Sequence, residues 1–269
     1  MKHVLAIIAF AALAIPATAL ADSQLTAVGS TALLPLVKAA AAKYEAEHAD
    51  LKISVSGGGS FVGIAQASSG VADLGDSDVI APGNSGLLDH KVCVVGFTIA
   101  VNPEANVKNL TAAQVRGIFG GKISNWKQVG GADKPITVIN RPRTSGTRFV
   151  FKATMMGTTP ISEGGITEDS SGTVTEMVAK TPGAITYVSR SYVEGKNDVV
   201  PVSIDGVTPS IENIRSGKWK IWSYEHIFTH GAARPDAQKF IDFITNDKDD
   251  LEKLGYIQIS TMKVREMGR

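Results

Sequence analysis

Along the chain, short apolar runs of strand length alternate with segments in which apolar residues recur at helical spacing. Short apolar runs of strand length lie at residues 25–28, 53–55, 72–75 and 92–101. Between the first two runs, apolar residues recur at helical spacing over residues 33–48, from Leu33 to Tyr44. A second helix is predicted over residues 61–69, between the next two runs. This alternation predicts an α/β fold with a mostly parallel sheet.

The rest of the chain repeats the pattern. Thr111 has Gln114 three residues after it, which is the spacing of a capping box and predicts a helix from there to Ile118. Further strands are predicted at 136–140 and 184–188, an extended stretch at 218–229, and helices from about 148, at 173–179 and at 236–245. The sequence has no Pro/Ser linker, no low-complexity segment and no repeat of solenoid period.

The first residues have the form of an export signal. Lys2 precedes an apolar run over residues 4–15, which is too short to span a bilayer as a helix. Ala19-Leu20-Ala21 then matches the small-x-small cleavage signature. We therefore expect residues 1–21 to be a signal peptide and the mature protein to be periplasmic. The alternative is a buried N-terminal helix.

Composition and charge narrow the class of protein. The chain has 269 residues, of which 43% are hydrophobic and 20% charged, as in an ordinary globular protein. Its formal charge of +1 argues against a nucleic-acid binder with a broad basic face. Its single cysteine, Cys93, excludes an internal disulfide and a zinc site of several thiolates. Cys93 lies in an apolar run and is predicted to be a buried hydrophobe.

Three loops share one design: each follows a predicted strand, contains Gly with Ser or Thr, and begins a helix. They are Gly29-Ser30-Thr31, Gly57-Gly58-Gly59-Ser60 and Thr144-Ser145-Gly146-Thr147. A helix N-terminus offers free backbone N–H groups and a partial positive charge, and glycine lets an anion approach the backbone. One such loop is ordinary helix capping. Three together predict an anion site.

Charged residues flank these loops. Arg141 precedes the third loop, where a guanidinium can grip two oxygens of a tetrahedral anion. The segment Asp73-Leu74-Gly75-Asp76-Ser77-Asp78 places carboxylates after a strand, and a carboxylate fits an anion site when the ligand carries a proton. The alternative is that these Asp residues belong to a turn or a solvated loop edge. Monohydrogen phosphate has such a proton and sulfate at neutral pH has none, so a buried Asp would select between them.

The chain resembles the phosphate-binding proteins of ABC-type phosphate importers over nearly all of its mature length. The resemblance rests on the three loops and on the joint order of the segments Asp73-Leu74-Gly75-Asp76-Ser77-Asp78, Asn109-Leu110-Thr111, Ile118-Phe119-Gly120-Gly121-Lys122-Ile123-Ser124-Asn125-Trp126 and Arg141-Pro142-Arg143-Thr144-Ser145-Gly146-Thr147-Arg148-Phe149. It implies a periplasmic binding protein of type II, with two lobes of mixed sheet flanked by helices and a ligand cleft between them.

The resemblance also implies the site. The implied phosphate ligands are Thr31, Ser60, Asp78, Arg141, Ser145, Gly146 and Thr147. Asp78 would accept the phosphate proton and Arg141 would be the charged donor, while Trp126 would pack in the second lobe. Lobe one is expected at residues 22–97 plus 226–269 and lobe two at 98–225, with crossovers near 96–101 and 222–228.

This sequence departs from the family pattern at Asp76, where family members have a small neutral residue. The extra carboxylate either points to the other face of the strand or faces the site. If it faced the site, it would weaken dianion binding or raise the proton affinity of the site. Arg143 either offsets that charge or is a solvated surface residue.

The function expected is therefore a non-enzymatic, monomeric phosphate receptor that hands its ligand to a membrane permease by hinge closure, with no metal or cofactor and no nucleic-acid partner. One alternative is a receptor for another oxyanion, namely arsenate, sulfate, molybdate or tungstate. Another is an exported phosphate-ester hydrolase, which would need a nucleophile with a base or a metal. His226 and His230 are spaced as a helical metal pair, but the residues around them predict a strand. Nothing in the sequence calls for an adhesion or signalling role.

Overall fold

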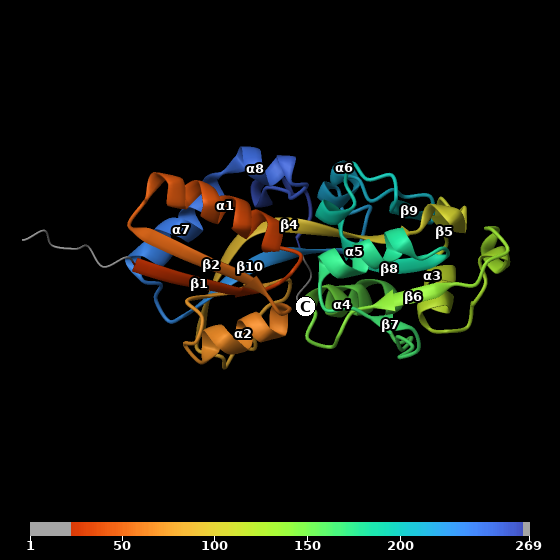
Figure 1. The fold of residues 1–269 in the computed structure, drawn as a ribbon, viewed down its shortest axis with the longest axis horizontal. Helices are drawn as coiled ribbons and strands as arrows, with labels where there is room; N and C mark the ends of the chain where they lie inside the picture. Colours follow the sequence, from red (N-terminus) through yellow and green to blue (C-terminus); the bar gives the residue numbers. More distant parts are fainter. Residues whose placement is uncertain (1–22, 266–269) are drawn as a thin grey trace, which may run out of the picture.

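The computed structural model describes residues 23–265. The predicted signal peptide lies outside the described residues. Figure 1 shows an elongated molecule of two lobes, with helices packed against strands in each. The strands are β1 (Ser23–Gly29), β2 (Leu51–Gly57), β3 (Leu74–Ser77), β4 (Leu87–Val101), β5 (Asn109–Leu110), β6 (Thr137–Asn140), β7 (Ile166–Thr167), β8 (Ala184–Ser189), β9 (Val200–Ile204) and β10 (Trp222–His230).

The α-helices are α1 (Leu34–Glu47), α2 (Ser60–Ser68), α3 (Ala112–Phe119), α4 (Gly146–Phe151), α5 (Ser171–Lys180), α6 (Ile211–Arg215), α7 (Pro235–Asn246) and α8 (Lys248–Lys253). Short 3-10 turns lie at Pro103–Ala105, Trp126–Val129, Arg190–Tyr192 and Ile259–Thr261, and a π-helical turn at Lys152–Met156 follows α4. Within residues 23–265, no helix has the length and apolar character needed to cross a bilayer.

The sheet is mixed, which confirms the α/β fold with mixed sheet flanked by helices that the resemblance implied; the mostly parallel sheet expected from the alternation of elements alone was wrong. The strand order is β2-β1-β3-β10-β4-β8-β6-β7, with β9 on β4 and β5 on β9. β1 is parallel to β2 and β3, but β10 is antiparallel to β3 and β4, and β4 is antiparallel to β8 and β9. The physical reason is that β4 runs from one lobe to the other and β10 runs back beside it (Figure 1), and two opposite passes pair antiparallel.

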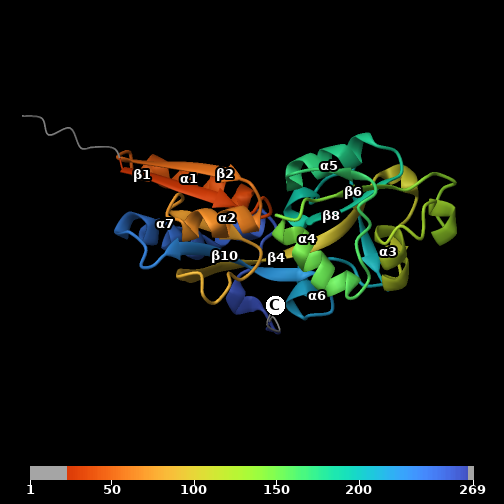
Figure 2. The ribbon, with the colours of Figure 1, turned by 90° about the horizontal axis from the view of Figure 1, so that it is seen from below.

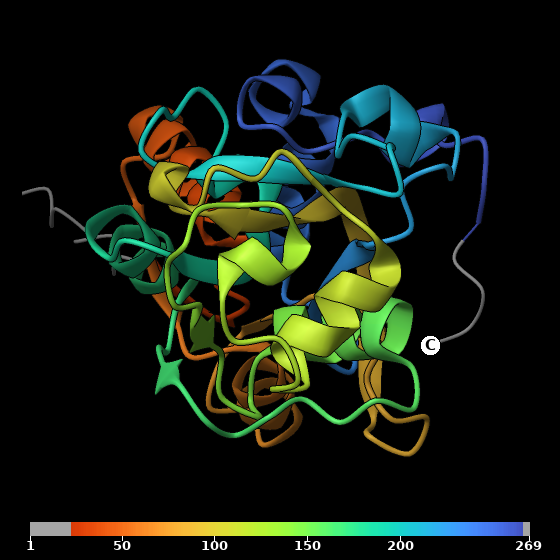
Figure 3. The ribbon, with the colours of Figure 1, turned by 90° about the vertical axis from the view of Figure 1, so that its right-hand side faces the viewer.

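The two long strands hold the halves of the molecule together. The first part of β4, up to Gly96, pairs with β10, and the last part, from Phe97 to Val101, pairs with β8 and β9. β1, β2, α1, α2 and α7 lie in the first lobe, and α3, α4, α5 and β6 to β9 in the second (Figures 1 and 2). Figure 3 shows the second lobe from its outer end, with the first lobe behind it. The residue boundaries of the lobes stay a prediction.

The first-lobe strands are covered on both sides (Figure 1). α1 packs on β2 and α7, and its buried residues include Leu36, Val37 and Tyr44, so the predicted helical face is confirmed. α2 packs on β1, β3 and β10. Trp126 of the second lobe is fully buried and its Nε1 donates to the Gly183 carbonyl at 2.9 Å, which confirms its predicted packing role.

The capping chemistry read from the sequence is present. Thr111 Oγ1 accepts from the Gln114 N–H at 3.1 Å, and Gln114 Oε1 accepts from the Thr111 N–H at 2.7 Å, which together form the capping box that begins α3. The predicted helix over 236–245 is α7. The short strand predicted at 72–75 is β3, which lies two residues further along the chain.

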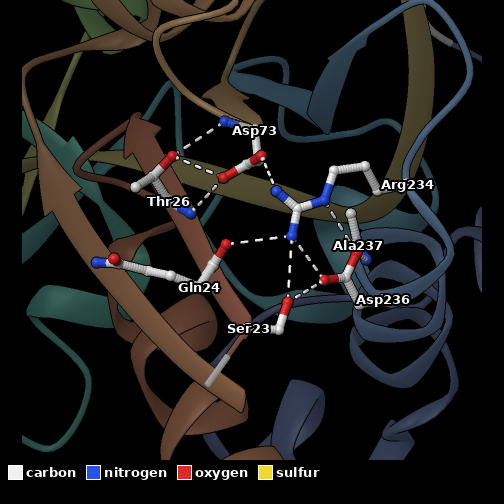
Figure 4. A network of polar contacts seen from close by, with 7 residues as sticks. All are labelled: Ser23, Gln24, Thr26, Asp73, Arg234, Asp236 and Ala237. Carbon is white, nitrogen blue, oxygen red and sulfur yellow. Dashed lines mark hydrogen bonds and ion pairs between the residues drawn. The ribbon is translucent and has the colours of Figure 1, made fainter. Parts of the chain in front are cut away.

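A polar network fixes the outer end of the first lobe (Figure 4). Arg234 donates to Asp236 at 2.7 Å and to Asp73 at 3.1 Å, and it also reaches Ser23 at the start of β1. Asp73 in turn accepts from the N–H and hydroxyl of Thr26. The network joins the N-terminal end of β1 to the start of α7 and to Asp73, the residue just before β3. It therefore holds the strand whose other end begins the first of the three loops.

Candidate anion-binding site

The three loops singled out in the sequence meet where the two lobes touch, a region called the seam below. The Gly59 N–H donates to the Gly29 carbonyl at 2.9 Å, which joins the first two loops within lobe one. The Phe61 N–H donates to the Thr144 carbonyl at 3.2 Å, which joins the second loop to the third across the seam. The loops precede α1, α2 and α4, so three helix N-termini converge there.

Asp78 lies at the centre of the seam and is 2% exposed. Its Oδ2 accepts from the Thr147 hydroxyl at 2.8 Å, and its Oδ1 accepts a short hydrogen bond from the Ser30 hydroxyl. Its backbone N–H donates to Ser60 Oγ at 2.9 Å. One carboxylate thus connects residues of both lobes.

Burial raises the pKa of the Asp78 carboxyl, because the charged form loses its hydration. The hydrogen bonds from Ser30 and Thr147 and the charge of Arg141 pull the pKa of the same group back down.

Arg141 is the buried cation of the seam, at 1% exposure. Its guanidinium donates to the carbonyls of Glu168 (3.1 Å) and Asp169 (2.9 Å), which fix its plane. It also donates to Thr31 Oγ1 at 3.1 Å, across the seam. Burial lowers the pKa of Arg141 and the Asp78 charge raises it. The Arg141 guanidinium is therefore a charged donor that the carbonyls of its own lobe hold in position and that points at Thr31 of the other lobe.

Glycine is required where the loops approach each other most closely. A Cβ on Gly146 would lie 2.1 Å from Ser60 Oγ and 2.9 Å from Asp78 Cβ. A Cβ on Gly59, whose φ is +93°, would lie 2.6 Å from the Thr144 carbonyl oxygen. Any side chain at either position would push the lobes apart.

All seven residues predicted for the site lie at this seam and are buried: Thr31, Ser60, Asp78, Arg141, Ser145, Gly146 and Thr147. Their side chains have different tasks. Ser145 Oγ accepts from the Arg148 N–H at 3.2 Å and so caps α4. The hydroxyls of Thr31 and Thr147 instead bond across the seam. Contact of these seven residues with an anion is a proposal, taken up below.

The sequence reasoning missed Ser171 and Tyr192. Ser171 is fully buried at the start of α5, and its N–H donates to Thr31 Oγ1 at 3.1 Å. Tyr192 donates its hydroxyl to the Thr31 carbonyl at 2.8 Å. Ser171 had a signal, because Ser170-Ser171-Gly172 repeats the Gly/Ser loop before a helix. Tyr192 had none, because only the tertiary fold brings it to Thr31.

Glu225 was also missed. It is fully buried on β10, opposite Cys93 of β4, and its side chain interacts with Asp78 and lowers the pKa of the Asp78 carboxyl. Cys93 is buried as predicted, and burial raises the pKa of its thiol well above the usual range. A lone Glu within a strand gives no sequence signal of burial, because most strand glutamates face water.

Asp76 points away from the α2 side of the sheet. Its neighbour Gly75 packs against Gly63 of α2, and successive strand residues face opposite ways. The Asp76 side chain is fully buried, and neither of its carboxyl oxygens has a hydrogen-bond partner. Burial, and then the charge of Asp78, raise its pKa well above the usual range. Asp76 therefore favours its neutral form, and a neutral carboxyl adds no repulsive charge beside Asp78.

Arg143 does not offset Asp76. Its side chain is 86% exposed and pairs with Glu163 of the same lobe at 3.2 Å. His226 and His230 lie on β10, as the predicted strand required. His226 Nδ1 lies 2.7 Å from Asp89 Oδ1, and His230 is exposed at the strand end. Among residues 23–265, no group of three or more His, Cys, Asp or Glu side chains is arranged to hold a metal ion.

Two lobes joined by two antiparallel strands, with buried polar groups where they meet, define the class of two-lobed solute-binding proteins. A family model described as a PBP superfamily domain matches residues 14–248. The chain is 44% identical over 253 residues to the phosphate-binding protein PstS of Bacillus subtilis, covering 91% of this chain and 83% of that one. The chain belongs to the PBP superfamily and, within it, to the PstS family of phosphate-binding proteins.

The chain is also similar to more distant relatives and to solved structures. PstS of Borreliella burgdorferi is 27% identical over 254 residues, covering 87% of this chain and 89% of the relative. A phosphate ABC transporter substrate-binding protein of Clostridium perfringens, solved with bound phosphate, matches with a TM-score of 0.83 at 29% identity, covering 88% of this chain and all of that one. A Vibrio cholerae phosphate transport receptor has a TM-score of 0.69 at 27% identity, covering 88% of this chain and all of that one.

Proposed function

We propose that this protein is an exported receptor that binds monohydrogen phosphate between its two lobes and delivers it to an ABC importer. The observation that carries the proposal is the buried Asp78 carboxyl, set among Ser30, Thr147 and the guanidinium of Arg141. Asp78 is an acceptor among groups that donate to it, namely the hydroxyls of Ser30 and Thr147. The names of the relatives support the same ligand.

The acceptor gives the site its selectivity. Monohydrogen phosphate carries one O–H, which donates to Asp78 while its other oxygens accept from the donors. Sulfate has no proton to donate, so its oxygen would face a buried carboxylate with no hydrogen bond between them. An unpaired buried charge costs several kcal/mol in general, roughly enough for discrimination of a thousandfold. Arsenate has the charge and proton of phosphate, so the site has no comparable means of rejecting it.

Closure of the lobes would complete the site. The ligand groups are divided between residues 22–97 plus 226–269, which hold Thr31, Ser60 and Asp78, and residues 98–225, which hold the others. β4 and β10 are the two segments that cross between these parts, so they supply the hinge. Phosphate binds groups of both parts and therefore favours the closed arrangement over an open one.

A binding role without catalysis is supported by the names of the relatives of this chain, which are phosphate-binding proteins. Ser145 Oγ, the nucleophile that the hydrolase alternative would need, accepts a hydrogen bond from the Arg148 N–H as the cap of α4. We therefore assign the chain as a receptor, active as a monomer in the periplasm after cleavage behind Ala21.

Calorimetric titration of the mature protein with phosphate, sulfate and arsenate tests the proposal. We expect one phosphate per chain with strong binding, comparable heat with arsenate, and no sulfate signal at millimolar concentration. Sulfate binding as strong as phosphate binding, or no phosphate binding, would overturn it. Turnover of a phosphate ester that stops in Ser145→Ala would instead support the hydrolase.

A further inference from the structure

Two phenylalanines meet at the outer rim of the seam. Phe61 of α2 and Phe149 of α4 come from different lobes, and their ring centroids are 5.9 Å apart with the planes at 71°, an edge-to-face contact. Figures 1 and 2 show α2 and α4 next to each other at the boundary of the lobes. This pair is called the aromatic bridge below.

The aromatic bridge is close to the anion site but separate from it. Both rings remain partly exposed, at 38% for Phe61 and 43% for Phe149, whereas the residues around Asp78 are buried. Neither ring is a hydrogen-bond partner of the groups that hold Asp78 and Arg141. The bridge therefore does not need to contact the anion in order to affect its binding.

The backbone beside the rings joins the same two loops. The Phe61 N–H donates to the Thr144 carbonyl, and the absence of a side chain on Gly59 lets that carbonyl approach. Phe149 is the fourth residue of α4, the helix that follows the loop containing Thr144. Opening a hinge in β4 and β10 would pull α2 away from α4, so it would break this backbone bond and separate the rings together.

We propose that the aromatic bridge is a closure contact: it forms only when the lobes are together, and it sets how long a bound anion stays without touching it. This inference rests on the proposed function, because phosphate is the ligand whose release it would control. A contact present only in the closed form slows opening and leaves the first encounter of ligand with the open form unchanged. Its effect should therefore appear in the dissociation rate.

A double-mutant cycle tests the bridge, with Phe61→Ala, Phe149→Ala and the double variant, and with phosphate as the probe in stopped-flow. We expect each single variant to raise the dissociation rate about two- to tenfold, the range given by an aromatic pair, with the association rate unchanged within about twofold. The double variant should be no faster than the faster single variant, because the same contact is lost once. Sulfate should give no binding signal in any of these variants, as in the wild type.

Leu88→Ala is the matched control, because Leu88 is an exposed apolar residue, at 48%, in the first-lobe part of β4. It should leave both rates unchanged. Thermal unfolding of the ligand-free variants checks their folding, and Phe61→Leu and Phe149→Leu, which keep an apolar helix surface, replace any alanine variant that unfolds. Unchanged dissociation in folded variants, or strictly additive effects, would overturn the inference. Absence of phosphate binding in the wild type would refute the proposed function instead.

Discussion

At the scale of single residues, the site sets the carboxylate of Asp78 among hydroxyl groups and the guanidinium of Arg141. Asp78 is the acceptor, and its two oxygens are each met by a hydroxyl from a different lobe. The seven residues implied by resemblance could be named in advance because they lie in short Gly/Ser/Thr loops or directly flank strands. Glu225 could not, since its burial beside Asp78 depends on β10 returning from the other lobe.

The raised pKa of Asp76 predicts how the free energy of unfolding depends on pH. Its pKa is raised in the folded protein, so the folded state holds a proton that the unfolded chain releases above its ordinary pKa. Stability from this group is present in acid and is lost as pH rises, with a slope of up to about 1.4 kcal/mol per pH unit until the folded pKa is passed. Asp76→Asn removes that slope.

We therefore expect the free energy of unfolding of ligand-free Asp76→Asn, relative to wild type, to increase steadily from pH 4.5 upward. Denaturant unfolding at several pH values measures it. The unpaired amide of the new Asn adds a cost that does not depend on pH, so only the slope is diagnostic. A difference that is constant over pH would show that Asp76 ionises normally in the folded protein.

At the scale of elements, the sequence predicted the helices well because their apolar faces are local patterns. α1, α3 and α7 all follow the predicted spacing or cap. Strand direction was not predictable in the same way, because pairing of β4 with β10 joins segments more than a hundred residues apart. The position of α5 at the seam was not predictable either, because the spacing of apolar residues within a helix does not show which other elements the helix contacts.

Two neighbouring serines at the start of α5 separate helix capping from site assembly. Ser170 Oγ accepts from the Thr173 N–H and caps the helix, whereas Ser171 contacts Thr31 and Arg141 in the seam. Ser170→Ala should lower stability by about 1 kcal/mol with phosphate affinity nearly unchanged. Ser171→Ala should weaken phosphate binding roughly three- to tenfold, as loss of one typical net hydrogen bond of about 1 kcal/mol does. Calorimetry and thermal unfolding of both variants give the comparison, and equal effects on affinity would contradict it.

At the scale of the whole molecule, the strands of the two lobes form one continuous strand order, whereas the residues of the site are divided between the lobes. β4 and β10 are the continuous connection, and the seam carries hydrogen bonds from Arg141 to Thr31 and from Thr147 to Asp78. The aromatic bridge adds an apolar contact at its rim. A ligand that satisfies the buried groups of both lobes would hold the molecule closed, which is the state a membrane partner could recognise.

Asp78→Asn tests the central claim most directly, with phosphate and sulfate titrated into wild type and variant. The carboxamide keeps the size of the carboxyl and adds an N–H donor, so a sulfate oxygen would meet a donor in place of a charge. We expect phosphate affinity to fall about tenfold or more and sulfate affinity to rise toward it. A variant that binds phosphate as the wild type does and still rejects sulfate would show that Asp78 does not accept the ligand proton.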